Sequence, residues 1–586
     1  MYLYKIIACR KHINYVNMPI KYLLLVTLFV KLSEALVIEL PDGKVKGLTD
    51  TTRSGITYHS FLALRYAQPP VGDLRFKPAL SVEPWEGTYD GTAEKNVCFQ
   101  VYENSYKENE DCLFLNVFTP VDLSNTSSTS DLAVMVWIHG GGFISGAAYM
   151  NEGGVGPKFF MDSTVVFVSI NYRLGPFGFM STGDKVLPGN LGLKDQVQAL
   201  KWVQKNIKYF GGDPEKVTIF GQSAGSASVS YQLLSPTSAG LYRAAILESG
   251  SSLSPWAYQR DQAEITFKTA QLIDPSFNSE NTTELLLFLQ SVPAVAIDNA
   301  SLLFSSTSES ASNYQISSGF FYAPVIEVAH EDAFLTEAQY GLLERGSYNR
   351  VPVMAGMTNE ESLGLLANGD LSFLWNAYDQ EPIIMVPDDL HVTNKDLRNT
   401  IGLEIRNYVT DSKGFNGDIA KGIMFHSMHD FDKANIKQAE LMSYHSTVHF
   451  YQFSYSGPMG YSSYRVPGTD GNVTHAEEVN YFFSKWYSNE IPDNTDMSYF
   501  PESDQNTHYR IMALWTNFVK YLNPTPQGMD KEILQNVTWE PVQPNVFKYL
   551  DIGKDLVLTE GYPKQEKYLF WNSLFSKYAV PPLDTF

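Results

Sequence analysis

The segment VTIFGQSAGSA, residues 217–227, constrains the fold of this chain more than any other short stretch. Four strand-forming residues run directly into GQSAG, Gly221 to Gly225, and SASVSYQLL follows with a helical pattern. A strand that turns abruptly into a helix forces its central residue, here Ser223, into a strained conformation, and it leaves no room for side chains two positions away on either side. The glycines therefore predict a tight turn with the Ser223 hydroxyl exposed at the positive end of a helix. An ordinary turn that contains a serine is the alternative.

Apolar runs elsewhere in the chain place this turn in a mostly parallel sheet. Segments with helical spacing separate the runs, as in LKDQVQALKWVQKNI. Continuous apolar strands that alternate with helices indicate an α/β fold, with a large, mostly parallel sheet covered by helices on both faces. Functional residues in such sheets sit on loops at the carboxyl ends of the strands. The runs that we expect to form buried strands are 133–138, 165–170, 217–220, 244–247, 351–355 and 448–453.

No feature of the sequence divides the chain into several domains. Its 586 residues are long for one domain, but no flexible linker, repeat or long charge block interrupts them. The polar stretch 125–131 is short enough to be a surface loop. A net charge of −21 argues against nucleic acid as a partner, because phosphates need a basic surface. We expect a single domain over residues 36–586, with sizeable insertions.

The first 35 residues have the features of a signal peptide. An apolar run, 22–30, lies between two lysines, and Ser33-Glu34-Ala35 resembles a small-x-small cleavage site. The alternative is a membrane anchor, but a span takes roughly 20 apolar residues and this run is much shorter. The residues before Met18 are unusual for a signal, so Met18 is a candidate for the true start. We expect a secreted, extracellular protein without a stable membrane span.

Cysteine usage agrees with secretion. Of the three cysteines, Cys9 precedes the proposed cleavage, which leaves Cys98 and Cys112 as an even pair in an oxidising compartment. Two free buried thiols are the alternative to a disulfide. Secretion also permits glycosylation at N-x-S/T sequons. These sequons lie at Asn125, Asn281, Asn299, Asn472 and Asn536.

A second glycine-rich loop, WIHGGGF, follows the strand predicted over residues 133–138. Three glycines allow backbone N–H groups to point into a site unhindered, and the N–H of Ala224 would supply another donor. Together these donors could stabilise the negative charge of a tetrahedral intermediate. The alternatives are a flexible turn or a phosphate-binding loop, but no GK[ST] follows and the acidic charge disfavours nucleotides.

A serine nucleophile needs a base, and histidine suits neutral pH. His475 lies in a polar loop, DGNVTHAEEV, whereas the other candidates fall in segments with helix or strand patterns. An orienting acid should follow another strand, and PVMAGMTNEES offers Glu360 and Glu361, which the spacing does not separate. The chain order Ser…Asp/Glu…His admits His391, His426, His429, His445, His449, His475 and His508.

These motifs together resemble the type-B carboxylesterase and cholinesterase family of the α/β-hydrolase superfamily. FGGDPEKVTIFGQSAG is similar to the active-serine signature of that family, and EDCLFLNVFTP to its second signature. WIHGGGF and VSINYRLGPFGFMS also resemble family blocks, and the similarity begins near Val37. Gln222, where glutamate is commoner, resembles the insect juvenile hormone esterases and their relatives.

The resemblance implies a catalytic triad of Ser223, Glu361 and His475. It also implies an oxyanion hole built from Gly141, Gly142 and Ala224, a disulfide between Cys98 and Cys112, and a supporting buried serine, Ser249. Two positions depart from the family pattern: Ser362 and Asn472 stand where glycine is usual, and Asn472 creates a sequon beside His475. Cysteines for the second disulfide of the family are absent.

The implied activity is hydrolysis of small-molecule carboxylic esters without a metal or cofactor, and the implied substrate is apolar. Juvenile hormone is one candidate among substrates of hormone, digestive, detoxifying, venom and odorant-degrading esterases. Cholinesterase activity is disfavoured because the loop closed by Cys98 and Cys112 contains no tryptophan to bind a quaternary ammonium. A noncatalytic adhesion member of the family is a further alternative, although every triad position is filled.

Overall fold

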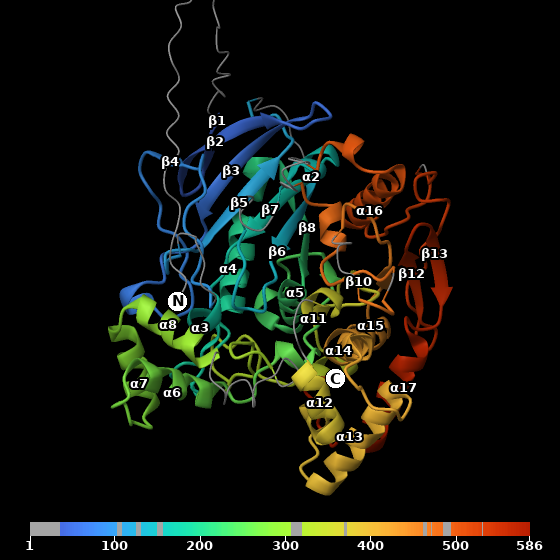
Figure 1. Ribbon diagram of the computed structural model, residues 1–586. Helices are drawn as coiled ribbons and strands as arrows, with labels where there is room; N and C mark the ends of the chain where they lie inside the picture. Colours follow the sequence, from blue (N-terminus) through green and yellow to red (C-terminus); the bar gives the residue numbers. More distant parts are fainter. Residues whose placement is uncertain are drawn as a thin grey trace, which may run out of the picture. The chain divides into compact units, whose positions relative to one another are not determined.

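The computed structural model describes residues 36–101, 108–124, 131–148, 156–305, 319–367, 372–460, 466–469, 471–484, 494–529 and 531–586. The chain divides into residues 1–34 and residues 35–586, and the fold below is that of the second unit (Figure 1). The predicted signal segment, Met18, Cys9 and the sequon at Asn125 lie outside the described residues.

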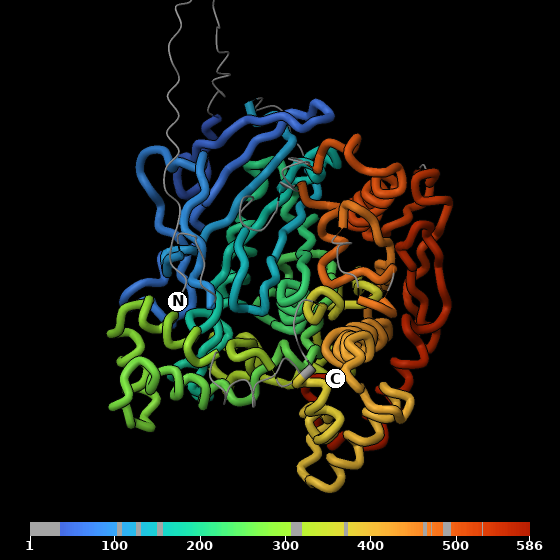
Figure 2. Tube along the Cα trace, viewed as in Figure 1, coloured from blue at the N-terminus to red at the C-terminus, as the bar shows by residue number. Residues whose placement is uncertain are grey.

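A single thirteen-stranded sheet forms the centre of the described residues (Figure 1). The strands from β7 through β6, β8, β9, β10 and β11 to β12 pair in parallel, and antiparallel strands flank them on both sides. Figure 2 shows that the first strands of the chain and the last ones lie at opposite edges of this sheet. The mostly parallel sheet predicted from the sequence is confirmed.

Six of the seven parallel strands overlap the predicted apolar runs, and β12 lies outside them. The seven parallel strands are β6 (Leu132–Ile138), β7 (Val166–Ile170), β8 (Gly212–Gln222), β9 (Ala244–Glu248), β10 (Val353–Thr358), β11 (Val448–Phe453) and β12 (Lys548–Ile552). The flanking strands are β1 (Leu36–Leu40), β2 (Gly43–Thr51), β3 (Thr57–Arg65), β4 (Thr88–Asp90), β5 (Phe114–Thr119) and β13 (Leu556–Glu560).

Both faces of the central strands are buried, which explains their uninterrupted apolar sequences. Along β6, Val134 and Val136 belong to one core cluster together with residues of α4 (Leu191–Asn206) and α5 (Ala224–Leu234). Their neighbours Met135 and Trp137 belong to a second cluster together with residues of α16 (Glu502–Tyr521). Alternate side chains of one strand therefore fill two separate cores.

The predicted insertions lie mainly between the later strands. Residues between β9 and β10 form α6 (Gln262–Ile273), α7 (Thr282–Ser291), α8 (Ala294–Ser305) and α10 (Gln339–Glu344). Residues between β10 and β11 form α11 (Leu363–Ala367), α12 (Ser372–Gln380), α13 (Lys395–Thr410), α14 (Ile419–His426), a π-helical turn (Ser427–Asp432) and α15 (Lys433–Ser443). The remaining helices are α2 (Lys158–Asp162), α3 (Gly175–Phe179) and α17 (Gln565–Tyr578).

The disulfide implied by the family resemblance is present. Cys98 and Cys112 are joined, with sulfur atoms 2.02 Å apart, and both side chains are buried. Among the described residues, no single helix has the length and apolar character needed to cross a membrane. Only α7 and α8 taken together, bent by 115°, meet those two criteria.

Candidate active site

The turn after β8 holds Ser223 in a conformation that few non-glycine residues adopt. Its backbone angles are φ 60° and ψ −126°, and its N–H donates to the carbonyl oxygen of Glu248 at 2.9 Å. A Cβ at Gly221 would lie 2.6 Å from the carbonyl carbon of Gly225, and a Cβ at Gly225 would lie 2.0 Å from the carbonyl oxygen of Ile138. Close backbone approach therefore requires both glycines, as the sequence predicts. Ser223 itself stays partly exposed between buried neighbours.

The glycine-rich loop after β6 packs against the Ser223 turn. Gly141 and Gly142 have φ angles of 102° and 62°, in the region that favours glycine. A Cβ at Gly140 would lie 3.1 Å from the Ser223 Cβ, so the two segments are in contact. Ala224 is the first residue of α5, and its N–H therefore has no acceptor within that helix. All three predicted oxyanion donors thus belong to segments that meet beside Ser223.

His475 and Glu361 are joined by a short side-chain contact. The Nδ1 of His475 lies 2.5 Å from Oε2 of Glu361, and the His475 N–H donates to the Glu361 carbonyl oxygen at 3.1 Å. Oε1 of the fully buried Glu361 accepts the Thr358 N–H at 2.8 Å. The loops after β10 and β11 are also connected by the Glu360 N–H, which donates to the Val473 carbonyl at 3.2 Å. Both carboxylate oxygens of Glu361 are therefore fixed, with one aimed at the ring.

The contacts distinguish the two adjacent glutamates that the spacing left together. Oε2 of Glu360 accepts from the Asn472 amide at 3.4 Å, and its Oε1 lies 3.9 Å from the Lys564 ammonium. Lys564 also pairs with Asp432 at 2.6 Å. Glu360 therefore belongs to a neighbouring ion cluster, and only Glu361 contacts His475.

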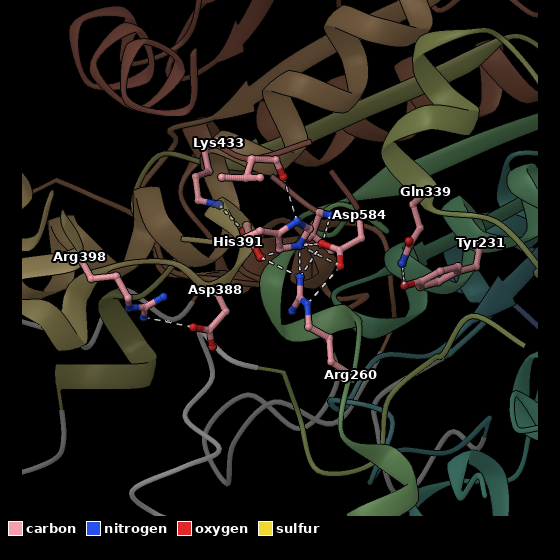
Figure 3. Close-up of polar contacts among 11 residues, drawn as sticks. Tyr231, Arg260, Gln339, Asp388, His391, Arg398, Lys433 and Asp584 are labelled. Atoms are coloured by element: carbon pink, nitrogen blue, oxygen red, sulfur yellow. Dashed lines mark hydrogen bonds and ion pairs between the residues drawn. The ribbon is translucent and has the colours of Figure 1, made fainter. Parts of the chain in front are cut away.

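His391 belongs to an ion network elsewhere in the fold (Figure 3). Its Nε2 lies 3.3 Å from Asp584, and its Nδ1 lies 3.2 Å from the Val580 carbonyl oxygen. Arg260 pairs with the same Asp584 at 2.5 Å. Contrary to the sequence pattern, His391 and His445 lie just after helices rather than within a helix or strand.

Burial excludes two other candidate bases. Burial lowers the pKa of His449 and of His508 to about 4, so both rings are neutral at ordinary pH but inaccessible to a substrate. His445 contacts the carbonyl oxygen of Glu344, and His426 and His429 share the carboxylate of Asp430. Among the seven candidates, His475 alone lies at the Ser223 turn.

The second ring nitrogen of His475 contacts a residue that sequence reasoning did not assign to the site. The side-chain nitrogen of Gln222 lies 3.0 Å from Nε2 of His475. Among the described residues, no hydrogen bond joins the Ser223 hydroxyl to the ring. The only signal in the sequence was the presence of Gln222 where the family usually has glutamate.

Buried carboxyl groups lie behind the histidine–glutamate pair. Ser249 donates to Oε1 of Glu478 at 3.5 Å, and Tyr451 donates to the same oxygen at 3.4 Å. Burial first, and the nearby Glu361 charge second, raise the pKa of Glu478 to about 8. Burial also raises the pKa of Glu248 well above its ordinary value. Glu478, which Ser249 contacts, therefore keeps its proton at neutral pH.

Aromatic side chains lie around the His475 ring and the glycine-rich loop. The Phe431 ring lies 4.7 Å from the His475 ring, and the Trp256 ring lies 5.7 Å from Phe431 and 5.5 Å from Phe320. Trp256 also faces Phe143 of the glycine-rich loop at 6.2 Å. These rings form an apolar wall between the glycine-rich loop and the imidazole.

Two cavities of the described residues lie away from this place. One of about 290 Å³ is bounded by Trp85, Tyr89 and Trp202, and one of about 440 Å³ lies beside Tyr348 and Asn349. Neither cavity shares a lining residue with the Ser223 turn, so side-chain contacts, not cavity size, identify the site.

The sheet order, the sharp turn after β8 and the loops after β10 and β11 define an α/β-hydrolase fold. The chain belongs to the carboxylesterase family, whose model matches residues 34–571, and it is an ester hydrolase that acts on small-molecule esters.

Relatives from insects support this assignment. The chain is 32% identical to venom carboxylesterase-6 of Apis mellifera, over 91% of this chain and 94% of that protein. It is 31% identical to juvenile hormone esterase of Tribolium castaneum, over 87% of each chain. The structure of juvenile hormone esterase from Manduca sexta, with OTFP covalently attached, matches with a TM-score of 0.80 at 26% identity, over 93% of this chain and 100% of that one.

Proposed function

We propose that this protein is a secreted serine esterase that cleaves apolar carboxylic esters through an acyl-enzyme intermediate, with Ser223, His475 and Glu361 as its triad. The observation that carries the proposal is the 2.5 Å contact between His475 Nδ1 and Glu361 Oε2, directly beside the Ser223 turn. The contact of Gln222 with Nε2 of His475 supports that position.

In the first half of the reaction, Ser223 Oγ bonds to the ester carbonyl carbon while its proton passes to Nε2 of His475. Glu361 accepts the Nδ1–H and stabilises the imidazolium. The N–H groups of Gly141, Gly142 and Ala224 donate to the oxyanion, where each donor contributes roughly 10²–10³ in rate. When the carbon–oxygen bond to the alcohol breaks, the departing oxygen takes the proton from Nε2.

In the second half, water replaces the alcohol. His475 takes a proton from the water as its oxygen attacks the acyl carbon, and it returns the proton to Ser223 Oγ as the acid leaves.

The aromatic wall supports an apolar substrate. Phe431, Trp256, Phe320 and Phe143 lie between the imidazole and the glycine-rich loop, where the acyl or alcohol part of an ester would bind. Aromatic rings offer large contact areas to apolar chains.

Labelling with a fluorophosphonate probe tests the nucleophile. We expect one covalent adduct, on Ser223, and none on the Ser223→Ala variant. Ser291→Ala, which removes an exposed hydroxyl on α7, is the matched control and should label like the wild type. A folded wild-type protein without an adduct would favour the noncatalytic, adhesive alternative.

A hydrolysis panel tests the substrate class. Short acyl esters are compared with long apolar methyl esters, a sesquiterpenoid methyl ester among them. Faster hydrolysis of the long esters supports the apolar assignment, and a clear preference for the sesquiterpenoid ester supports juvenile hormone. The reverse ranking removes the hormone assignment.

Secretion and glycosylation are part of the proposal. We assign residues 1–35 to a signal peptide and residues 36–586 to one domain, because the apolar run 22–30 and the small-x-small site Ser33-Glu34-Ala35 are typical of a signal. Amino-terminal sequencing of protein secreted from insect cells should begin at residue 36. Asn281, Asn299 and Asn536 are exposed and can carry glycans, whereas the half-buried Asn472 donates its amide to Glu360 and should remain unmodified.

A further inference from the structure

The Gln222 side chain lies between the glycine-rich loop and His475. It is 7% exposed, and its oxygen would lie 3.4 Å from a Cβ at Gly140. Among the described residues its amide has one hydrogen-bond partner, Nε2 of His475, at 3.0 Å. That nitrogen is the one that must accept the Ser223 proton during catalysis.

The chemistry of an amide restricts what this contact can be. An amide NH₂ group donates hydrogen bonds and cannot accept them, so Nε2 of His475 is unprotonated and Nδ1–H faces Glu361. If the amide rotates by half a turn, its oxygen can accept from a protonated Nε2. As the side chain stands in the structure, with its NH₂ on Nε2, glutamine favours the neutral ring, whereas glutamate in this place would favour the imidazolium.

We propose that Gln222 is a positioning residue, whose amide holds the His475 ring through Nε2 until an ester binds and then releases that nitrogen to Ser223. The inference rests on the proposed function, because it assigns His475 as the base. In the absence of an ester, the Gln222 amide and the Ser223 hydroxyl compete for the lone pair of His475 Nε2. The neutral amide also keeps His475 unprotonated at lower pH than a carboxylate at residue 222 would.

Other charged groups act on the histidine–glutamate pair from the Glu361 side. Glu478 and Asp432 each interact electrostatically with Glu361, as does the Lys564 ammonium, and Glu248 interacts with Glu478. Glu360 directly precedes Glu361 in the sequence, and Glu477 directly precedes Glu478. His139 of the glycine-rich loop has its pKa lowered to about 4 by burial and is neutral under assay conditions. Substitution at residue 222 leaves all of these groups in place, and it alone changes the surroundings of Nε2.

The test compares pH profiles of kcat/KM for the full-length wild type, Gln222→Met and Gln222→Glu, with phosphonylation of Ser223 by the fluorophosphonate probe as a second rate. The acid limb of kcat/KM reports the base in the free enzyme. Methionine has a similar length and no donor, so the limb should move upward by about half a pH unit to one unit. Glutamate should move it upward by about 1 to 3 units.

Gln198→Glu on α4 is the charge-matched control, because this amide contacts Ser81 and not the imidazole. Its acid limb should coincide with that of the wild type. Above the acid limb, Gln222→Met should be phosphonylated at least as fast as the wild type, because no donor competes with Ser223 for Nε2.

A graded order of acid limbs, from Gln through Met to Glu, supports the proposal. Acid limbs that coincide while the rate falls equally at every pH would overturn it and reduce Gln222 to a packing role. If Gln222→Glu does not fold, the Met variant decides alone. A wild type that neither hydrolyses esters nor reacts with the probe refutes the proposed function itself, which is distinguishable from failure at residue 222.

Discussion

His475 with Glu361, and His426 and His429 with Asp430, are two buried histidine–carboxylate clusters of the same molecule that differ at the second ring nitrogen. Asp430 accepts from Nδ1 of His426 at 2.8 Å and from Nδ1 of His429 at 2.6 Å. The His426 and His429 side chains are 5% and 1% exposed, whereas the His475 side chain is 12% exposed.

The second ring nitrogen of His426, Nε2, also has a hydrogen-bond partner, because it contacts the Tyr378 hydroxyl at 3.0 Å. Nε2 of His475 instead faces Gln222, the residue before Ser223. A short histidine–carboxylate contact therefore does not identify a catalytic base. What distinguishes His475 is a second nitrogen that contacts Gln222, the neighbour of a strained and partly exposed serine.

The largest expected effect follows from exchanging the carboxylate of the first cluster for an amide. Glu361→Gln would place NH₂ against Nδ1 of His475 and favour the wrong tautomer, so kcat should fall by about 10⁴-fold. Steady-state hydrolysis at saturating substrate measures the loss. The adjacent Glu360→Gln is the matched control and should keep most of the wild-type kcat, since Glu360 contacts Asn472 and Lys564 instead. Equal losses in both variants would refute the distinction between the two glutamates.

The equivalent exchange in the second cluster should affect stability and not rate. Asp430→Asn removes the shared charge from two buried histidines, and we expect a loss of about 3–5 kcal/mol in the free energy of unfolding. Burial tends to raise the pKa of Asp430, but His426 and His429 outweigh burial and hold the pKa below 3.8. The stabilisation is therefore present above about pH 4 and declines at lower pH.

Denaturant unfolding of the wild type and of Asp430→Asn at pH 7 and at pH 3.5 measures the difference in their free energies of unfolding. This difference should be smaller at the lower pH. The kcat of the folded Asp430→Asn variant should stay close to that of the wild type. A collapse of kcat at unchanged stability would make the two clusters functionally alike and contradict the comparison.

The most gradual effect, spread over several pH units, concerns Glu478, behind the first cluster. Its pKa is raised from 4.5 to about 8, so the folded protein keeps a proton that the unfolded chain has lost, and stability falls as pH rises through this window. Glu478→Gln has no proton to lose and should reduce the decline by at most about 1.4 kcal/mol per pH unit. Unfolding free energies at pH 5, 6, 7 and 8 measure the slope. The control variant Glu331→Gln, at an exposed residue, should leave the slope of unfolding free energy against pH unchanged. Parallel slopes for Glu478→Gln and the wild type would contradict a raised pKa of Glu478.

Local patterns were sufficient to predict six of the seven parallel strands and the turn at Ser223, but not β12. The apolar runs of β6 to β11 are continuous because both faces are buried, and Gly221 and Gly225 report a close backbone approach at one place. Flanking strands such as β2, which is fully buried at only two of its nine residues, were not predicted because their sequence lacks that apolar run.

Contacts between distant segments could not be read from the sequence. Spacing did not separate Glu360 from Glu361, because adjacent residues of a loop become different only when another loop packs against them. The contact between Gln222 and His475 joins positions 253 residues apart, and the order of side chains around a ring is decided by packing. Nor did any local signal indicate the π-helical turn that carries Phe431 to the imidazole.

Hydrogen bonds between β8, β9, β10 and β11 hold the three site-bearing strand ends in register without any residue of the long insertions. Lineages can therefore lengthen, shorten or exchange those insertions while the reacting atoms keep their spacing. Changes confined to the insertions should therefore alter which esters bind and leave the spacing of the reacting atoms unchanged.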